Sequence, residues 1–319
     1  MNDEKPAPGT GVQFFEVDSE YEGQRVDNFL LSRLKGLPKS RLYKLLRKGE
    51  LRVNKRRTKP DYKLVAGDLI RVPPMRLAER GEVALAGEGL KARLAESILY
   101  EDNGILIVNK PSGLAVHGGS GVSLGLIEAL RQMRPEAKFL ELAHRLDRDT
   151  SGCIIVAKRR SALRALHELF RGVGMDKRYL ALAAGEWPQR RSTVSVALKK
   201  NELKSGERVV RPAADGKESL TRFSIVRRLK GATLIEAKPV TGRTHQIRVH
   251  AQYAGHPLVG DDKYGDEAVD KKMRELGSKR LFLHAWRLNF ELSGKRVQVE
   301  AKLPEELSKL VDRLNKDER

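Results

Sequence analysis

Acidic and basic side chains alternate in the stretch HRLDRDTSG, residues 144–152, directly before the apolar run CIIVA. Asp147 stands between Arg145 and Arg148, so its carboxylate is expected to remain ionised at the mouth of a buried strand. Such a carboxylate can act as a nucleophile or a base. A turn in which Asp147 and Asp149 cap backbone amides accounts for the same residues, and both interpretations stay open at this point.

A second polar group lies in TGRTHQIRVHAQYAGHPLVGDDKYG, residues 241–265. Interpreted as a strand, RTHQIRVHA places Arg243, His245 and Ile247 on one side and Arg248 on the other. Arg248 is then a candidate partner for a carboxylate. An edge strand with one hydrated face is the alternative interpretation.

The residue pattern does not favour a metal or nucleotide site. None of the seven histidines falls in an HExxH motif or beside the single cysteine, and His245 and His250 would lie on opposite faces of a strand. The stretch HGGSG, residues 117–121, lacks P-loop, GxGxxG and GxSxG spacing, so a flexible loop is expected there. We predict neither a metal nor a cofactor.

The charge balance indicates a polyanionic partner. Among 319 residues, 62 Lys and Arg outnumber 42 Asp and Glu, giving a formal charge of +20. A generally basic, solvated surface would give the same total, but the bases cluster between Pro38 and Lys63. Such a cluster is typical of a surface that meets phosphates. The residues expected to contact RNA are Lys39, Arg41, Lys44, Arg47, Lys48, Arg52, Lys55, Arg56 and Arg57.

Cysteine content and hydropathy indicate the cellular compartment of the protein. Cys153 is the only cysteine, so no internal disulfide can form, and its apolar surroundings predict a small buried thiol. The N-terminus has no apolar signal region, and no stretch approaches the roughly 18 apolar residues of a membrane span. We expect a cytoplasmic protein without membrane contact.

The elements that must position these residues form two groups. Residues 1–14 are expected to be a disordered tail, and 15–78 a compact unit with a helix ending at Gly36 and a second helix. That second helix is capped by Ser40, carries Leu42, Leu45 and Leu46, and ends at Gly49 before the strand ELRVN. Short strands are predicted on both sides of Gly67-Asp68.

The rest of the chain reads as a linker followed by a larger domain. We interpret residues 79–95 as a linker, with a helix packed on the next domain as the alternative. Residues 96–319 predict an α+β domain, because strands outnumber helices and cluster late. Strands are expected at GILIVNK, GCIIVAK, RYLALAAGE, SLTRFSIVRRL, ATLIEAKPV, HQIRVHA and LFLHAWRLNFEL, and helices at LGLIEALRQM, SALRALHELFRG and PEELSKLVDRLNK.

The motifs together resemble a known family. HRLDRDTSG, KRYLALAAG, VTGRTHQIRVHAQYAGHPLVGDDKYG and LFLHAWRL are similar to successive motifs of the RluA-class RNA pseudouridine synthases. GQRVDNFLLSRLKGLPKSRLYKLLRKGELRVNKRR resembles the S-four-type RNA-binding domain. The resemblance implies a pseudouridine synthase fold, with a mixed, largely antiparallel sheet flanked by helices and loops.

The resemblance also implies a reaction and its residues. It places the catalytic aspartate at Asp147, an active-site tyrosine at Tyr179 and the arginine that pairs with the aspartate at Arg248. Arg145 matches a residue that engages RNA beside a flipped base, and Ile247 one that lines the uracil pocket. The remaining polar residues of the second motif that we assign to substrate binding are Arg243 and His245.

The implied substrate is 23S ribosomal RNA or a large-subunit assembly intermediate. The implied reaction oxidises, reduces and hydrolyses nothing, so no cofactor is expected. We expect a monomer, because an irregular RNA fold offers no symmetry for a dimer to match. The motifs NKPSGLAVHGGSG and FLELAHRLDRDTSG point to the members of the class that act on this RNA. The sequence argues against two other functions. A non-catalytic ribosome-associated protein would not need all four catalytic-motif residues, and an RNA methyltransferase would need a glycine-rich nucleotide-binding turn that is not seen.

Overall fold

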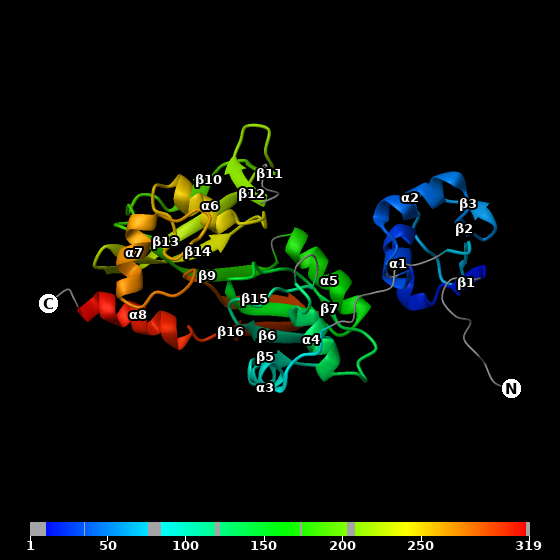
Figure 1. Ribbon diagram of the computed structural model, residues 1–319, viewed down its shortest axis with the longest axis horizontal. Coiled ribbons are helices and arrows are strands. Elements are labelled where there is room, and N and C mark those ends of the chain that lie inside the picture. Colours follow the sequence, from blue (N-terminus) through cyan, green and yellow to red (C-terminus); the bar gives the residue numbers. More distant parts are fainter. Residues whose placement is uncertain are drawn as a thin grey trace. The chain divides into compact units, whose positions relative to one another are not determined.

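The structure is a computed structural model that describes residues 11–34, 36–75, 84–118, 122–172, 174–202 and 208–316. Its contacts divide the chain into two compact units, Met1–Ala84 and Leu85–Arg319. Each unit has its own hydrophobic core, and Figure 1 shows the elements of both.

The N-terminal unit packs two helices on one face of a four-stranded antiparallel sheet of order β1-β4-β2-β3. A 3-10 turn at Ser19–Tyr21 precedes the first helix. The bounds are β1 Gln13–Glu16, α1 Val26–Arg33, α2 Lys39–Lys48, β2 Arg52–Val53, β3 Arg56–Arg57 and β4 Leu69–Val72.

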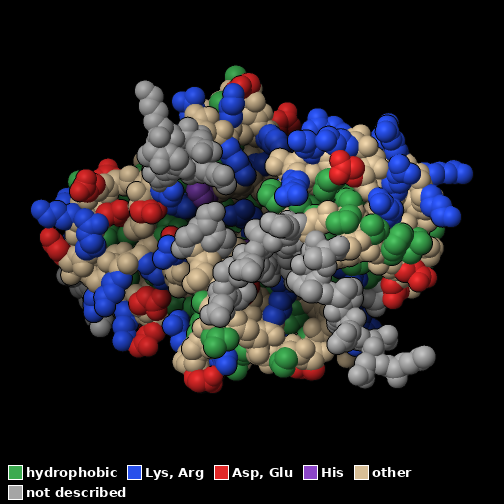
Figure 2. Space-filling view, turned by 45° about the vertical axis from the view of Figure 1, so that its right-hand side comes forward, with side chains coloured by type: hydrophobic (Ala, Val, Ile, Leu, Met, Phe, Trp, Pro, Cys, Tyr) green, Lys and Arg blue, Asp and Glu red, His purple; other side chains and the backbone are tan. Residues whose placement is uncertain are grey.

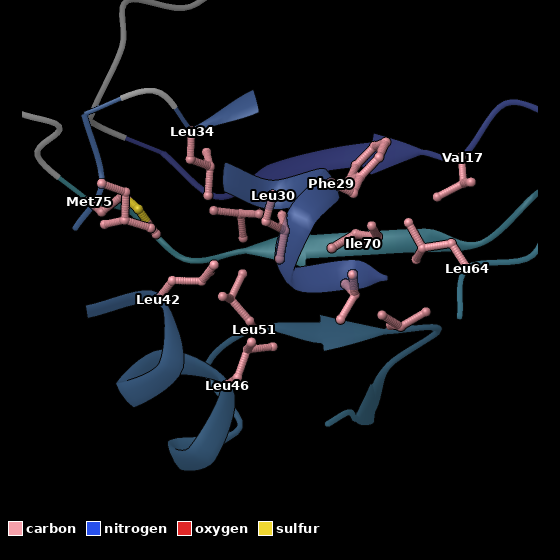
Figure 3. Close-up of a cluster of buried hydrophobic side chains, with 14 residues drawn as sticks. Val17, Phe29, Leu30, Leu34, Leu42, Leu46, Leu51, Leu64, Ile70 and Met75 are labelled. Carbon is pink, nitrogen blue, oxygen red and sulfur yellow. The ribbon is translucent and has the colours of Figure 1, made fainter. Parts of the chain in front are cut away.

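The core of this unit comes from helical spacing in the sequence (Figure 3). Phe29 and Leu30 of α1 meet Leu42 and Leu46 of α2 over Ile70 of β4, and all five are buried. Residues three and four apart share a helix face, which is why these positions converge. Both predicted helices are therefore confirmed.

The helix ends differ in part from the sequence expectation. Gly49 ends α2 in the left-handed conformation (φ 71°), as predicted. Ser40 is not the cap, because α2 already begins at Lys39 with Pro38 in the cap position. A helix capped by Ser40 would begin at Arg41, so α2 starts two residues earlier than the serine pattern indicated.

Two other expectations for this unit need correction. The tail was expected to include residues up to 14, but β1 begins at Gln13 and pairs with β4; residues 1–10 of that tail lie outside the described residues. Only the second of the two strands around Gly67-Asp68 forms. On the N-terminal side of this turn, Lys63 makes only an isolated bridge to Arg25.

The second unit is built on a ten-stranded mixed sheet (Figure 1). Its strands follow the order β10-β13-β14-β9-β15-β8-β6-β5, with β16 paired to β15 and β7 to β8. The β8 and β15 pair is parallel, and the other pairs are antiparallel. The bounds are β5 Ile98–Glu101, β6 Ile105–Lys110, β7 Glu141–Leu142, β8 Ser151–Ala157, β9 Asp176–Ala184, β10 Thr193–Ser195, β13 Leu220–Leu229, β14 Ala232–Pro239, β15 Leu283–Leu292 and β16 Lys295–Glu300.

Helices lie around this sheet, and a separate two-stranded hairpin of β11 and β12 follows β10 (Figure 1). None of the helices in the described ranges is long and apolar enough to cross a membrane. The bounds are α3 Glu88–Glu96, α4 Leu126–Met133, α5 Arg160–Arg171, β11 Leu198–Glu202, β12 Arg208–Pro212, α6 Gln246–Tyr253, α7 Glu267–Glu275 and α8 Glu305–Lys316.

The strand β8 is apolar throughout because both faces of the sheet are covered at this point. Ile154 packs with Leu130 of α4, whereas Ile155 packs with Leu166 of α5 on the opposite face. Cys153 is a buried free thiol, as predicted, and burial raises its pKa to about 12. The continuous apolar run CIIVA is thus the sequence form of a doubly covered strand.

The α+β prediction and the largely antiparallel sheet are confirmed, with one wrong element. HQIRVHA was predicted as a strand, but it forms the helix α6. Residues 246–251 are all buried. The alternation of polar and apolar residues that indicated a strand therefore did not separate a solvent-exposed face from a buried one. In a short, fully buried segment, periodicity does not separate helix from strand.

The segment expected as a linker also contains structure. The helix α3 covers Glu88–Glu96 and its Leu94 is buried with residues of α4, which is the alternative given for this segment. Residues 76–83 lie outside the described residues. The sequence contained too few apolar residues at helical spacing to make this helix the first choice.

Candidate active site

A cleft of about 550 Å³ in the second unit gathers the motif residues from separate elements. The loop between β7 and β8 supplies Arg145 and Asp147, and β9 supplies Tyr179. The segment that enters α6 supplies residues 243–248. Every residue predicted for catalysis or substrate binding therefore lines this one cleft: Asp147, Tyr179, Arg248, Arg145, Ile247, Arg243 and His245.

Asp147 faces a guanidinium that comes from far along the chain. Nη1 of Arg248 lies 3.5 Å from Oδ2 of Asp147, and Nε2 of His245 lies 3.9 Å from Oδ1. The side chain of Asp147 is 20% exposed, so a ligand in the cleft can reach it. The neighbouring Arg148 does not hold it, because its Nε donates to the carbonyl of Gly113.

Arg248 is itself held by a buried carboxylate that the sequence interpretation missed. Nε and Nη2 of Arg248 donate to the two oxygens of Asp261 at 2.7 and 2.6 Å, and Nη2 also reaches Asp262 at 3.1 Å. Asp261 is fully buried and also accepts from the backbone amides of Lys263 and Tyr264. This two-point pair orients the guanidinium and leaves Nη1 for Asp147.

The charge on Arg248 is secured by its surroundings. Burial opposes the positive charge, but the hydrogen bonds and charges of Asp261 and the charge of Asp147 raise the pKa of Arg248 above its ordinary value. The doublet GDD in the quoted motif was the signal available in the sequence, since a carboxylate after a glycine turn can fold back onto a helix. Arg248 thus stays cationic next to Asp147.

Tyr179 forms part of the apolar wall of the cleft. It packs with Leu146 and Ala285 on one side and with Ile247 on the other. Burial, and then the negative charge of Asp147, raise the pKa of the Tyr179 hydroxyl. The phenol is therefore neutral near pH 7, and its ring can serve as a stacking face for a flat base.

The start of α6 is held by one glutamine. Oε1 of Gln246 accepts from the Thr241 hydroxyl at 2.7 Å and from the Arg243 backbone amide at 2.9 Å. Its Nε2 donates to the Leu220 carbonyl and the Thr221 hydroxyl. The turn that these bonds close brings Ile247 and Arg248 to the cleft.

His245 occupies the cap position of α6 in the left-handed region (φ 51°). Its Nδ1 lies 2.8 Å from the hydroxyl of Tyr264, which also accepts from the Val210 backbone amide. Burial lowers the pKa of His245, although the charge of Asp147 opposes this. A strained, tethered histidine beside the carboxylate is consistent with a substrate contact.

The loop that carries Asp147 is braced by a half-buried histidine and a buried lysine that sequence reasoning did not single out. Nε2 of His144 accepts from the backbone amide of Ile155 in β8, and burial lowers the pKa of His144 to about 3. Lys110, fully buried at the end of β6, donates to the carbonyls of Pro111, Leu114 and Arg148, each at 2.9 Å. Burial lowers the pKa of Lys110 to about 7.

Acidification should destabilise the fold through three histidines that stay neutral in the folded chain. Burial lowers the pKa of His144 to about 3 and those of His250 and His284 to about 4. Because the unfolded chain binds these protons near pH 6.5 and the folded chain does not, the stability present above that pH is lost as pH falls toward 4. We expect the free energy of unfolding to fall by about 1.4 kcal/mol per pH unit for each histidine.

Urea unfolding at pH values between 6 and 4.5 measures this slope. His284 lies between the Ser151 hydroxyl and the Ala301 carbonyl. The variant His284→Gln should have a smaller pH slope by about 1.4 kcal/mol per unit. Equal slopes for wild type and variant would rule this histidine out as a source of acid sensitivity.

The basic residues predicted for RNA contact lie in the N-terminal unit, on α2 and the β2–β3 hairpin, and all of them are exposed. Figure 2 shows Lys and Arg side chains at many places on the surface in that view, with a larger group of them at the upper right. The set is Lys39, Arg41, Lys44, Arg47, Lys48, Arg52, Lys55, Arg56 and Arg57.

Comparisons with known proteins agree with this geometry. The model of the RNA pseudouridylate synthase family matches residues 104–253, and that of the S4 domain matches residues 24–70. The solved structure titled "Human RNA Pseudouridylate Synthase Domain Containing 4" is 26% identical with a TM-score of 0.59, and the match covers 71% of this chain and 95% of that one.

Curated relatives extend the match over almost the whole chain. Ribosomal large subunit pseudouridine synthase C of Haemophilus influenzae is 53% identical, covering 96% of each chain. The protein of the same name from Escherichia coli is 55% identical, covering 95% of this chain and 97% of that one. The resemblance found in the motifs is thereby confirmed, and the chain belongs to the RNA pseudouridylate synthase family.

Proposed function

We propose that this protein converts specific uridines of 23S ribosomal RNA into pseudouridine. The observation that carries the proposal is the meeting of Asp147, Arg248 and Tyr179 in one cleft. The names of the two curated relatives support the choice of large-subunit RNA. The substrate is the free RNA or an assembly intermediate of the large subunit.

The reaction breaks the bond between N1 of uracil and C1′ of the sugar, turns the base, and joins C5 to C1′. The proton on C5 leaves and N1 gains one, so no atom is gained or lost overall. A carboxylate can assist because the sugar carbon becomes electron-poor as the bond breaks, as in glycoside hydrolysis. Asp147 is the carboxylate at the cleft.

The uridine must leave its stack before it reaches Asp147. Flipping costs a few kcal/mol, and least where the RNA is already unpaired. Stacking on Tyr179 would return roughly 1–3 kcal/mol, while Ile247 lines the same pocket. The exposed guanidinium groups of Arg145 and Arg243 also line the cleft, where they can meet the phosphates beside the flipped base.

Release of tritium from RNA labelled at carbon 5 of uridine tests the reaction. Wild-type protein should release tritium from 23S RNA without an added cofactor. Mapping pseudouridines in ribosomal RNA from cells that lack the protein would then identify the sites. A complete set of large-subunit pseudouridines in such cells would contradict the proposal.

The ring and the hydroxyl of Tyr179 are proposed to have separate functions, stacking on the base and moving a proton. Tyr179→Phe keeps the stacking face and should bind RNA normally while losing about 10²–10⁴-fold in turnover, if the hydroxyl moves the C5 proton. Tyr179→Ala should also weaken binding. Single-turnover kinetics with the two variants measures both effects, and full activity of Tyr179→Phe would remove the hydroxyl from the mechanism.

The basic residues of the S4 domain are proposed to hold the RNA backbone. Replacing Arg47, Arg56 and Arg57 by Gln should weaken RNA binding and reduce the slope of log affinity against log salt by about 2, since each phosphate contact on a single strand contributes about 0.7. A binding titration at several salt concentrations measures the slope. An unchanged slope would count against this role.

We further propose a monomer in the cytoplasm. An irregular RNA fold offers no twofold symmetry for a dimer to match. Sedimentation of the protein with and without RNA measures the oligomeric state.

A further inference from the structure

The N-terminal sheet carries three arginines in one row across its strands. Arg52 of β2 is paired with Arg57 of β3 on one side and with Arg71 of β4 on the other. On β1, Phe14 is paired with Arg71. Directly opposite residues of antiparallel strands share a face, and the adjacent Ile70 is buried in the core. The row therefore lies on the face of the sheet away from the core.

The end of α2 holds these side chains in place. Nε of Arg52 donates to the Gly49 carbonyl at 3.0 Å, and Nη1 of Arg71 donates to the Glu50 carbonyl at 3.1 Å. An ideal Cβ at position 49 would lie 2.5 Å from Nε of Arg57, so this side chain lies against the glycine. The last carbonyls of a helix carry partial negative charge that attracts cations.

This arrangement leaves cationic charge unneutralised. Glu50, next to the row, pairs instead with Lys48 at 3.9 Å. Among the described residues, no ion pair joins Arg52, Arg57 or Arg71 to a carboxylate. Like charges set directly opposite one another destabilise a sheet. In the free protein the arginine row is therefore unfavourable, and only its contacts with the carbonyls offset that cost.

Phe14 stands at the end of the row with its ring turned outward. It is 58% exposed, whereas Phe15 points inward and meets Phe29 edge to face at 6.4 Å. A surface for unpaired RNA combines an aromatic ring with basic side chains. The exposed ring of Phe14 and the arginine row beside it supply both components. The guanidinium groups match phosphates, and the ring matches the face of a base.

We propose that Arg52, Arg57, Arg71 and Phe14 form a binding surface for an unpaired RNA segment, with phosphates along the arginines and one base stacked on Phe14. This surface rests on the proposed function, because it serves the same RNA. It goes beyond the basic set already described, since Phe14 and Arg71 lie outside that set and outside the matched residues 24–70 of the S4 domain. A base inside a duplex cannot offer its face, so the surface selects unpaired strands.

The full-length chain tests the aromatic contact. The probes are an oligoadenylate and a fully paired, blunt-ended RNA duplex with the same number of phosphates. Phe14→Ala should weaken oligoadenylate binding by about 5- to 150-fold and leave duplex binding unchanged. Phe14→Trp should restore affinity, with quenching of the added indole fluorescence. The matched control is Val65→Ala, which removes a 51% exposed apolar side chain from the same unit.

The arginines are tested by their salt dependence. Replacing Arg52, Arg57 and Arg71 by Gln should reduce the salt slope for the oligoadenylate by about 2, whereas Lys309→Gln, an exposed cation of the second unit, should not. Arg52 and Arg57 are exposed, but Arg71 is half-buried, so thermal unfolding of each variant verifies that it is folded.

Three results would overturn the proposal. The first is unchanged oligoadenylate affinity of Phe14→Ala, and the second is an equal loss of affinity for the duplex. The third is a loss of binding to large-subunit particles with naked RNA affinity intact, which would assign the surface to a protein. Tritium release by wild-type protein separates the two claims. If the wild-type protein releases no tritium, the proposed reaction is wrong and the binding results still apply. If release is normal but the substitutions leave RNA binding unchanged, only the proposed surface is wrong.

Discussion

Asp147→Asn is expected to reduce tritium release by at least about 10³-fold while RNA affinity stays within about twofold of wild type. The amide has the shape of the carboxylate but no charge, so it cannot stabilise or bond to the electron-poor sugar carbon. Arg248 keeps its two-point pair with Asp261 in this variant, so the fold is expected to survive. Single-turnover release and a binding titration measure the two quantities.

Asp149→Asn is the matched control for this experiment. Asp149 belongs to the same motif, but it does not line the cleft. Its variant should keep close to wild-type activity. If Asp147→Asn retained a tenth of wild-type release, or if both variants lost activity equally, Asp147 would not be the reacting carboxylate.

Arg248→Ala is expected to lose most activity and also stability, with RNA affinity little changed. Its removal leaves the fully buried Asp261 with only backbone amides, and breaking a buried pair costs about 3–5 kcal/mol. It also leaves Asp147 without the guanidinium that orients it. Urea unfolding measures the first effect, and turnover well below the variant's unfolding midpoint measures the second.

Two further variants separate orientation from stability. Arg248→Lys keeps a charge but has no planar fork with which to bind Asp261 and reach Asp147 together. Asp261→Asn leaves the guanidinium in place without its charged anchor, so Asp261 acts as a positioning residue. Both should lower turnover with little effect on RNA affinity, while equal losses of turnover and affinity would contradict this role for Arg248.

The sequence by itself located the carboxylate that we propose as the reacting group. Asp147 stood out because a carboxylate among arginines preceded a run that had to be buried, and β8 is indeed buried on both faces. The helices of the N-terminal unit followed from apolar spacing, and Gly49 from the need for a left-handed residue at a helix end. These are local patterns, so neighbouring residues suffice to determine them.

Only the tertiary structure decided which charges meet. The arginines beside Asp147 in sequence are not its partners, because Arg148 turns to the Gly113 carbonyl and the contact comes from Arg248, 101 positions later. The helix α6 and the buried Asp261 that aim this arginine were not evident from residue order, since a short segment buried on all sides carries no periodic signal. Electrostatic pairing depends on distance in space, and the packing of distant segments determines that distance.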